Sequence, residues 1–198
     1  MPLEARQIYF SYGRKKQWLL ENFSITIEPG ERLVILGPSG YGKTTLARIL
    51  SGYEKPKRGE ILLHKKPLPQ GGVCPVQLIF QHPEYAVNPR WPMKKVLKEG
   101  GGIGQEALAV YGIEPDWMER FPGELSGGEL QRFCVARALL AKPEYLICDE
   151  ISTMLDPITQ AQIWKVILKE NETRGMGVVA ITHNEHLARQ IGQRIIRL

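Results

Sequence analysis

Hydrophobic and polar positions alternate along two segments near the start of the chain. This alternation at residues 7–12 and 23–27 predicts half-buried strands. The apolar run at residues 32–36 ends at Gly37 and is typical of a fully buried parallel strand. Further short strands are expected at residues 60–63, 76–80, 145–148, 177–181 and 194–198.

Helical segments follow most of the later strands, and they are expected at residues 43–51, 127–141, 157–172 and 184–191. Strands that alternate with helices indicate an α/β fold whose parallel sheet is covered on both faces. Residues 82–124 differ, because they contain prolines, the triplet Gly100, Gly101 and Gly102, and short amphipathic runs at 93–99 and 105–111. They predict a small helical insertion.

Length and composition limit the class of protein. The chain has 198 residues, enough for one core with a small attached lobe. It has no apolar run long enough to span a bilayer, and its N-terminus lacks the apolar region of a signal peptide. The net charge is +5, but the basic residues are scattered, so we expect no nucleic-acid partner. Cys74, Cys134 and Cys148 lack a metal-ligand spacing and suit a reducing compartment.

Residues 37–45, with the sequence GPSGYGKTT, fit the phosphate-binding pattern Gly-x-x-x-x-Gly-Lys-Ser/Thr. Its glycines let the backbone approach phosphate oxygens, and the following helix directs its N-terminal N–H groups toward them. Lys43 can reach the β- and γ-phosphates, and the Thr44 hydroxyl can bind Mg²⁺. An ordinary glycine-rich turn is the alternative. The candidate phosphate-binding residues are Gly37, Pro38, Ser39, Gly40, Tyr41, Gly42, Lys43, Thr44 and Thr45.

Two carboxylates follow the apolar strand that is expected at residues 145–148. Open α/β sheets place their ligand sites at the carboxyl ends of strands, which is where Asp149 lies. Asp149 would hold Mg²⁺ through water, and Glu150 could polarise the attacking water as a general base. The alternative is that both are solvated loop carboxylates.

The segment LSGGE at residues 125–129 fits a capping box that opens the helix at 127–141. A capped helix N-terminus also attracts anions. Capping alone does not require two glycines at the start of a helix, where glycine weakens the helix relative to alanine. The excess of glycine therefore favours an anion-binding role for Ser126, Gly127 and Gly128.

Together, the phosphate loop and the sequence LSGGELQR resemble the ATP-binding cassette (ABC) ATPase family, and the resemblance covers nearly the whole chain. The family uses this signature in trans. The resemblance therefore implies that Ser126, Gly127 and Gly128 complete the ATP site of a second subunit, in a dimer that ATP closes.

The resemblance also assigns roles to four other residues. Gln81 matches the glutamine that senses Mg²⁺ and the attacking water, and His183 matches the histidine that contacts the γ-phosphate. Asp156 matches an aspartate that communicates across the dimer, although it also fits a helix N-cap before Pro157. Tyr12 matches the aromatic residue that stacks on adenine, and plain packing is its alternative.

The family fold that this resemblance implies is a P-loop NTPase nucleotide-binding domain. It has a mostly parallel sheet, N-terminal antiparallel strands and a small helical subdomain. We expect one domain over residues 1–198, with a RecA-like core at about 1–81 and 142–198 and the helical subdomain at about 82–141. The chain ends soon after His183, so no C-terminal regulatory domain is expected. Residues 151–154 depart from the proline, threonine, serine and alanine that are usual there.

Residues 76–90, VQLIFQHPEYAVNPR, resemble ATPases of dipeptide, oligopeptide and nickel importers. The resemblance implies an ATP-hydrolysing importer subunit at the cytoplasmic face of the cell membrane, with ATP and Mg²⁺ as cofactors. Its partners would be permease subunits, a second ABC ATPase (a copy or a homologue) and a solute-binding protein. Two alternatives stay open, namely a soluble ABC ATPase of DNA repair or translation, and a P-loop kinase.

Overall fold

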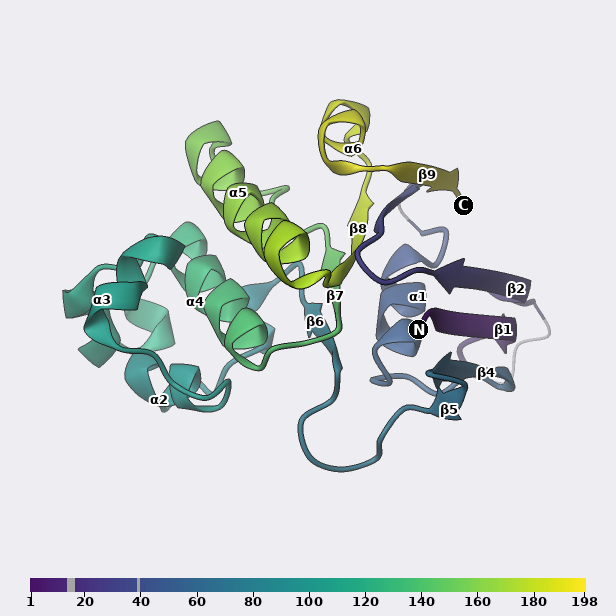
Figure 1. Cartoon of the computed structure of the whole chain (residues 1–198), viewed down its shortest axis with the longest axis horizontal. Helices are drawn as coiled ribbons and strands as arrows, with labels where there is room; N and C mark the ends of the chain where they lie inside the picture. Colours follow the sequence, from purple (N-terminus) through teal and green to yellow (C-terminus); the bar gives the residue numbers. More distant parts are fainter. Residues whose placement is uncertain (14–16, 39) are drawn as a thin grey trace.

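The strands form two sheets of different kinds in a computed structural model, which describes residues 1–13, 17–38 and 40–198 (Figure 1). The first sheet is antiparallel, with the strand order β2-β1-β4-β5. Its strands are β1 (Leu3–Phe10), β2 (Leu20–Ile27), β4 (Arg58–Leu63) and β5 (Lys66–Pro67). The antiparallel strands expected at the N-terminus are therefore confirmed, as a sheet of their own.

The second sheet is parallel throughout, with the strand order β6-β7-β8-β3-β9. Its strands are β3 (Arg32–Leu36), β6 (Val76–Ile79), β7 (Tyr145–Asp149), β8 (Gly177–Thr182) and β9 (Arg194–Arg197). Every residue of β7 and β8 is buried, as expected for central parallel strands that are covered on both faces. This arrangement confirms the α/β fold class.

Six α-helices in the described residues surround the parallel sheet. Helix α1 lies beside the antiparallel sheet, whereas α2, α3 and α4 gather at the opposite end of the molecule (Figure 1). The helices are α1 (Lys43–Leu50), α2 (Met93–Lys98), α3 (Gln105–Leu108), α4 (Gly127–Leu140), α5 (Pro157–Arg174) and α6 (Glu185–Ile191). Short 3₁₀ turns lie at Pro83–Tyr85, Ala109–Tyr111, Pro115–Glu119 and Pro122–Glu124.

Successive residues of β3 point into two different hydrophobic cores. Leu33 and Ile35 join a core that also holds the apolar side of α1 and the inner face of the antiparallel sheet. Val34 and Leu36 join a second core, which is built with residues of α2, α4, α5 and α6. Because strand side chains alternate between faces, one buried strand anchors both layers and fixes the position of the loop that follows it.

Two expected elements differ from the structure. Strand β1 begins at Leu3 and ends at Phe10, whereas the alternation had predicted residues 7–12. The strand pairing shifts register on either side of Ile8, and Gln7 has a left-handed backbone with φ of 49°. Such a bulge reverses the alternation of side chains, so the pattern detects only part of the strand. The run at 105–111 is helical, as expected for the insertion, but in two parts: α3 ends at Leu108 and a 3₁₀ turn follows it.

The described part of the chain contains no helix that is long and apolar enough to cross a membrane. Cys134 and Cys148 are buried, and Cys74 is half-buried; all three are free thiols. Burial raises the pKa of Cys134 to about 11, so this thiol stays protonated and packs as an apolar side chain.

Candidate active site

The phosphate loop connects β3 to α1, as the sequence predicts. Gly40 and Gly42 have left-handed backbones, with φ of 89° and 85°. Residues other than glycine rarely adopt this backbone conformation, which explains why glycines occupy the tight turn. Gly42 is also the N-cap of α1, so the free N–H groups at the start of that helix face the loop. The predicted residue Ser39 lies outside the described residues.

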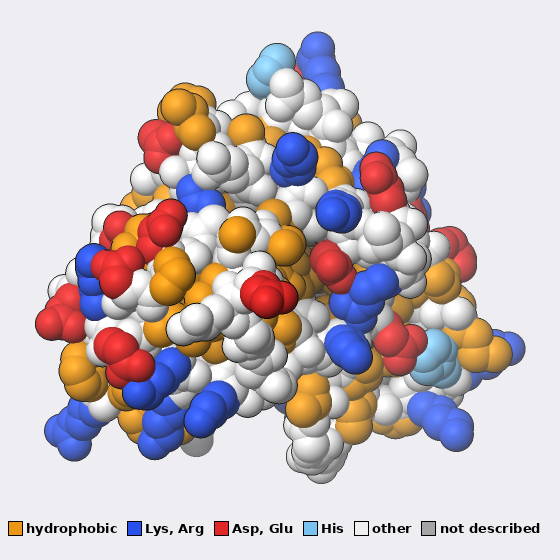
Figure 2. Space-filling model, turned by 60° about the vertical axis from the view of Figure 1, so that its left-hand side comes forward, with side chains coloured by type: hydrophobic (Ala, Val, Ile, Leu, Met, Phe, Trp, Pro, Cys, Tyr) orange, Lys and Arg blue, Asp and Glu red, His pale blue; other side chains and the backbone are white. Residues whose placement is uncertain are grey.

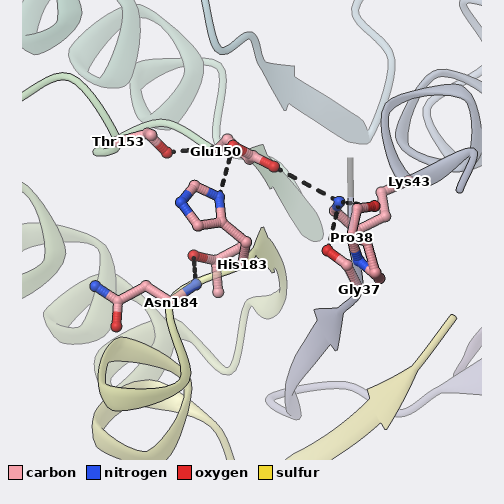
Figure 3. A network of polar contacts seen from close by, with 8 residues as sticks. Gly37, Pro38, Lys43, Glu150, Thr153, His183 and Asn184 are labelled. Carbon is pink, nitrogen blue, oxygen red and sulfur yellow. Dashed lines mark hydrogen bonds and ion pairs between the residues drawn. The ribbon is translucent and has the colours of Figure 1, made fainter. Parts of the chain in front are cut away.

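The Lys43 ammonium group lies against the loop's own backbone. Its Nζ atom donates hydrogen bonds to the carbonyl oxygens of Gly37, at 2.8 Å, and Pro38, at 2.9 Å (Figure 3). The same atom lies 3.7 Å from Oε1 of Glu150. Lys43 is only 4% exposed, so its charge is held in the site by these oxygen atoms.

Glu150 follows the last residue of β7, and its carboxylate faces the phosphate loop (Figure 3). Its Oε2 atom lies 3.2 Å from Nδ1 of His183 and accepts a hydrogen bond from the Thr153 hydroxyl at 3.4 Å. The carboxylate thus has Lys43 on one oxygen, and His183 and Thr153 on the other. Glu150 and His183 come from the ends of the adjacent strands β7 and β8, so the parallel sheet brings them together.

Asp149 is buried beside the start of α1. It is 2% exposed, and its Oδ1 atom has no hydrogen-bond partner within the described residues. Burial raises the pKa of Asp149, and a hydrogen bond with the Thr44 side chain opposes that rise. A carboxylate oxygen without a partner next to a hydroxyl suits a divalent cation, because Mg²⁺ is usually held by few protein oxygens together with phosphates.

One cleft of about 420 Å³ brings many of the predicted residues together. Tyr12 lies at this cleft, where its hydroxyl is 2.9 Å from the Thr45 hydroxyl and 54% of its surface is exposed. The cleft is lined by Tyr12, Leu19, Gly40, Gly42, Lys43, Thr44, Thr45, Gln81 and Glu150. The cleft thus holds residues predicted for adenine, for the phosphates and for the cation, whereas Asp149 and His183 are not part of its described lining.

The glycine-rich start of α4 lies outside the described lining of this cleft. Ser126 is the N-cap of α4; its hydroxyl accepts a hydrogen bond from the Glu129 N–H at 3.3 Å, and its own N–H donates to Oε2 of Glu129 at 2.7 Å. The predicted capping box is therefore confirmed. A Cβ atom added at Gly127 would meet nothing within 4 Å, and one at Gly128 would make only ordinary contacts.

Asp156 caps the next helix, α5. Its Oδ1 atom accepts hydrogen bonds from the N–H groups of Ile158 and Thr159, each at 3.0 Å. A hydrogen bond with the Thr159 side chain, together with these backbone bonds, lowers the pKa of Asp156. The N-cap interpretation is confirmed, and like Ser126 this residue lies outside the described lining of the cleft.

Comparison with known proteins decides which kind of site this is. A family model described as "ABC transporter" matches residues 20–153. The chain belongs to the ABC transporter family. It is an ATPase subunit of this family, and the family expectation drawn from its two main motifs is confirmed.

Relatives and solved structures of ABC proteins cover almost the entire chain. It is 36% identical to "Nickel import system ATP-binding protein NikE" of Staphylococcus aureus (strain bovine RF122 / ET3-1), over 99% of this chain and 86% of that protein. NikE of strain N315 is 35% identical over the same shares. The ATP-binding cassette MJ0796, in a dimeric post-hydrolysis state bound to ADP and Pi, superposes with a TM-score of 0.85 at 26% identity, covering 99% of this chain and 94% of that one.

Three side chains that shape the turn after Glu150, namely Ser152, Thr153 and Trp164, were not predicted from the sequence. Thr153 contacts the Glu150 carboxylate, and the Trp164 indole donates a hydrogen bond to the Ser152 hydroxyl at 3.2 Å. The departure of residues 151–154 from the usual family pattern is the one local signal that could have drawn attention to Thr153 and Ser152. Trp164 lies twelve residues after Ser152, and their contact depends on how α5 packs. The sequence around either residue therefore does not predict it.

Proposed function

We propose that this chain is the ATP-hydrolysing subunit of an ABC importer for nickel, metal chelates or peptides. Its relatives named as nickel import ATP-binding proteins match nearly all of its length, which supports the nickel and metal-chelate part of this range. The observation that carries the ATPase assignment is the convergence of Lys43, Thr44 and Glu150 in one cleft.

ATP would occupy this cleft, with adenine stacked on Tyr12 and the phosphates in the loop. Tyr12, which is 54% exposed, and the buried Lys43 both line this cavity. Mg²⁺ would be held by Thr44, Gln81 and Asp149, and when bound it would neutralise charge on the β- and γ-phosphates. The phosphates would be held by Gly37, Pro38, Ser39, Gly40, Tyr41, Gly42, Lys43, Thr44 and Thr45.

The chain's own residues would then drive hydrolysis. Lys43 would exchange the Gly37 and Pro38 carbonyls for phosphate oxygens, which are stronger partners because they are charged. Glu150 would take a proton from the attacking water as the new bond to the γ-phosphorus forms and the bond to the β–γ bridging oxygen breaks. The products are ADP and phosphate. His183, which faces Glu150, would contact the γ-phosphate, and Gln81 would orient the water.

A second cassette, either a copy or a homologue, would complete this site. Ser126, Gly127 and Gly128 form the exposed start of α4, where free N–H groups attract anions. The open space around Gly127 leaves room for a phosphate to approach the backbone. Asp156, at the start of α5, would contact the other cassette in the closed dimer.

Residues 82–141 would form a helical subdomain that receives a permease subunit, while residues 1–81 and 142–198 form the catalytic core. A cavity of about 410 Å³ lies beside this region. Three of its lining side chains are apolar yet largely exposed: Tyr53 at 62%, Val73 at 64% and Tyr85 at 83%. Exposed apolar clusters mark protein contacts. Phe80 also lines this cavity, and the next residue, Gln81, lines the ATP cleft, so a permease bound here would lie close to the ATP site.

This function places the protein at the cytoplasmic face of the cell membrane, held there by permease subunits. Nucleic acid is not among the proposed partners. On the face that Figure 2 presents, lysines and arginines are interspersed with acidic side chains, which is typical of a solvated surface rather than a phosphate-binding one.

Affinity capture from detergent-solubilised membranes of the native cell tests the proposal, with this chain as bait and partners identified by mass. We expect two polytopic membrane proteins and a second ABC ATPase, together with a solute-binding protein when substrate is present. A Tyr85→Glu bait should lose the membrane proteins, whereas a control Glu144→Gln bait should keep them. Recovery of ribosomes or DNA-repair factors without membrane proteins would reject the importer and leave the ATPase chemistry intact.

A further inference from the structure

The residue that we assign as the general base has an unusual backbone. Glu150 has a left-handed conformation, with φ of 48°. Residues other than glycine or asparagine rarely adopt it, and it persists only where surrounding contacts enforce it. Two backbone bonds contribute, since the Glu150 N–H donates to the Ile181 carbonyl at 3.0 Å and the Thr153 N–H donates to the Glu150 carbonyl at 3.2 Å.

A buried side-chain bond fixes the turn that follows. Nε1 of Trp164, on α5, donates to the Ser152 hydroxyl at 3.2 Å, and both residues are 5% exposed. A buried indole N–H needs an acceptor, so this bond ties the turn to α5 at one position. Ile151, which is 3% exposed, adds an apolar anchor beside it.

The fixed turn brings one more hydroxyl to the site. Thr153 Oγ1 donates to Oε2 of Glu150 at 3.4 Å, on the oxygen that also faces Nδ1 of His183 (Figure 3). The Thr153 side chain is exposed, whereas that of Ser152 is buried. Burial in the core therefore does not explain where the Thr153 side chain lies. The hydrogen bond described for the Thr153 side chain is the one to the Glu150 carboxylate, the group that our mechanism assigns as the general base.

We propose that Thr153 is a positioning residue for the Glu150 carboxylate, and that Trp164 holds it in place through Ser152. The inference rests on the proposed role of Glu150 as the base. The Thr153 hydroxyl restrains rotation of the Glu150 carboxylate, while Lys43 restrains the other oxygen until ATP takes the lysine away. Thr153 then keeps one carboxylate oxygen fixed and leaves Oε1 free to accept the proton from water.

Steady-state and single-turnover ATP hydrolysis by the full chain tests this assignment, in complex with its membrane subunits where these are recovered. Thr153→Val removes the hydroxyl and keeps the branched shape, whereas Thr153→Ser keeps the hydroxyl. We expect Thr153→Val to lower kcat by about 10- to 100-fold, with KM and ATP affinity unchanged, because a slightly misplaced catalytic group loses rate rather than binding. Thr153→Ser should restore most of the rate.

Trp164→Phe keeps an aromatic ring but removes the N–H, and it should lower kcat in the same way. Matched controls are Thr173→Val, at an exposed threonine of α5, and Trp117→Phe, in a 3₁₀ turn of the helical region. Both controls should retain normal kcat. The melting temperature of each variant is measured alongside, so that a loss of kcat is not mistaken for a loss of folded protein. An unchanged kcat in Thr153→Val would overturn the proposal.

A double variant separates positioning from a general structural effect. If Thr153 acts through Glu150, Thr153→Val should cause no further loss in the Glu150→Gln background. A full additional loss there would overturn the proposal. If Glu150→Gln retained turnover, the base assignment itself would be wrong and the positioning role would fall with it. Loss in Glu150→Gln without loss in Thr153→Val would reject the positioning role alone.

Discussion

Nδ1 of His183 lies 3.2 Å from Oε2 of Glu150, across the ends of two adjacent parallel strands. The His183 side chain is 52% exposed, whereas that of Glu150 is 12% exposed. In the proposed mechanism, the exposed histidine would contact the γ-phosphate while it stays beside the Glu150 carboxylate. The pair would then link the phosphate site to the group that activates water.

His183→Ala should reduce ATP turnover by about 100-fold, the usual size of a lost acid–base or orienting partner, and leave ATP binding almost unchanged. Nucleotide affinity and phosphate release measured on the same preparation would show this. His186→Ala, at an exposed histidine of α6, is the matched control and should retain full activity. Normal turnover in His183→Ala would remove this residue from the mechanism.

Lys43→Ala should weaken ATP binding by about tenfold or more, because a hydrogen bond to a charged group contributes about 1.5–3 kcal/mol. Titration calorimetry with ATP measures the loss. Lys66→Ala, on the exposed strand β5, tests whether removal of any lysine has this effect, and it should bind normally. Equal affinity in the wild type and Lys43→Ala would contradict the phosphate-loop assignment.

Asp149→Asn should separate stability from metal binding. Burial raises the pKa of Asp149. The folded state therefore favours the protonated carboxyl, and ionisation at neutral pH costs stability that the asparagine variant avoids. The nucleotide-free variant should melt at a higher temperature than the wild type, and its affinity for Mg²⁺ with ATP should fall by about tenfold or more.

Thermal melts with and without Mg²⁺ and ATP measure both effects. Asp116→Asn, at an exposed aspartate of a 3₁₀ turn, serves as the control and should change neither. If Asp149→Asn melted lower and bound Mg²⁺ as the wild type does, the structural account of this carboxylate would be wrong.

Asp156 should stabilise the protein only in its ionised form. Its pKa is lowered by hydrogen bonds to the Thr159 side chain and to backbone N–H groups at the start of α5. A lowered folded-state pKa means that the stabilisation is complete above the unfolded value, near 3.8, and is lost as pH falls through the folded value. Asp156→Asn keeps a good N-cap but removes the charge.

Melting temperatures measured from pH 7 to pH 2 test this dependence. The wild type should be more stable than Asp156→Asn at pH 7, and the difference should disappear toward pH 2. A difference that stays constant across this range would show that the charge of Asp156 plays no part in capping α5.

The sequence predicted the parts of the site that short segments encode. The phosphate loop, the capping box at Ser126 and the N-cap at Asp156 each depend on residues within a few positions of one another, and each lies in the predicted local structure. The buried strands were also predictable, because they are continuous apolar runs between turn residues. The start of β1 was missed because a bulge at Gln7 reverses the alternation.

The missed features depend on contacts between distant segments. The hydrogen bond between Trp164 and Ser152, and the left-handed backbone of Glu150, arise from the way α5 and β8 pack against the turn after β7. The separate antiparallel sheet was likewise not specified by the alternating pattern, which indicates half-burial but not the pairing partner.

ATP-dependent dimer formation by Glu150→Gln tests the central claim most directly, since loss of hydrolysis should trap the closed state. Light scattering should give one chain mass, 22.4 kDa, without nucleotide and twice that mass with ATP. Adding Ser126→Arg to this variant should abolish the dimer but preserve ATP binding, because the large cation blocks the start of α4. A monomer with ATP in Glu150→Gln, or an intact dimer in the double variant, would contradict a site completed by a second cassette.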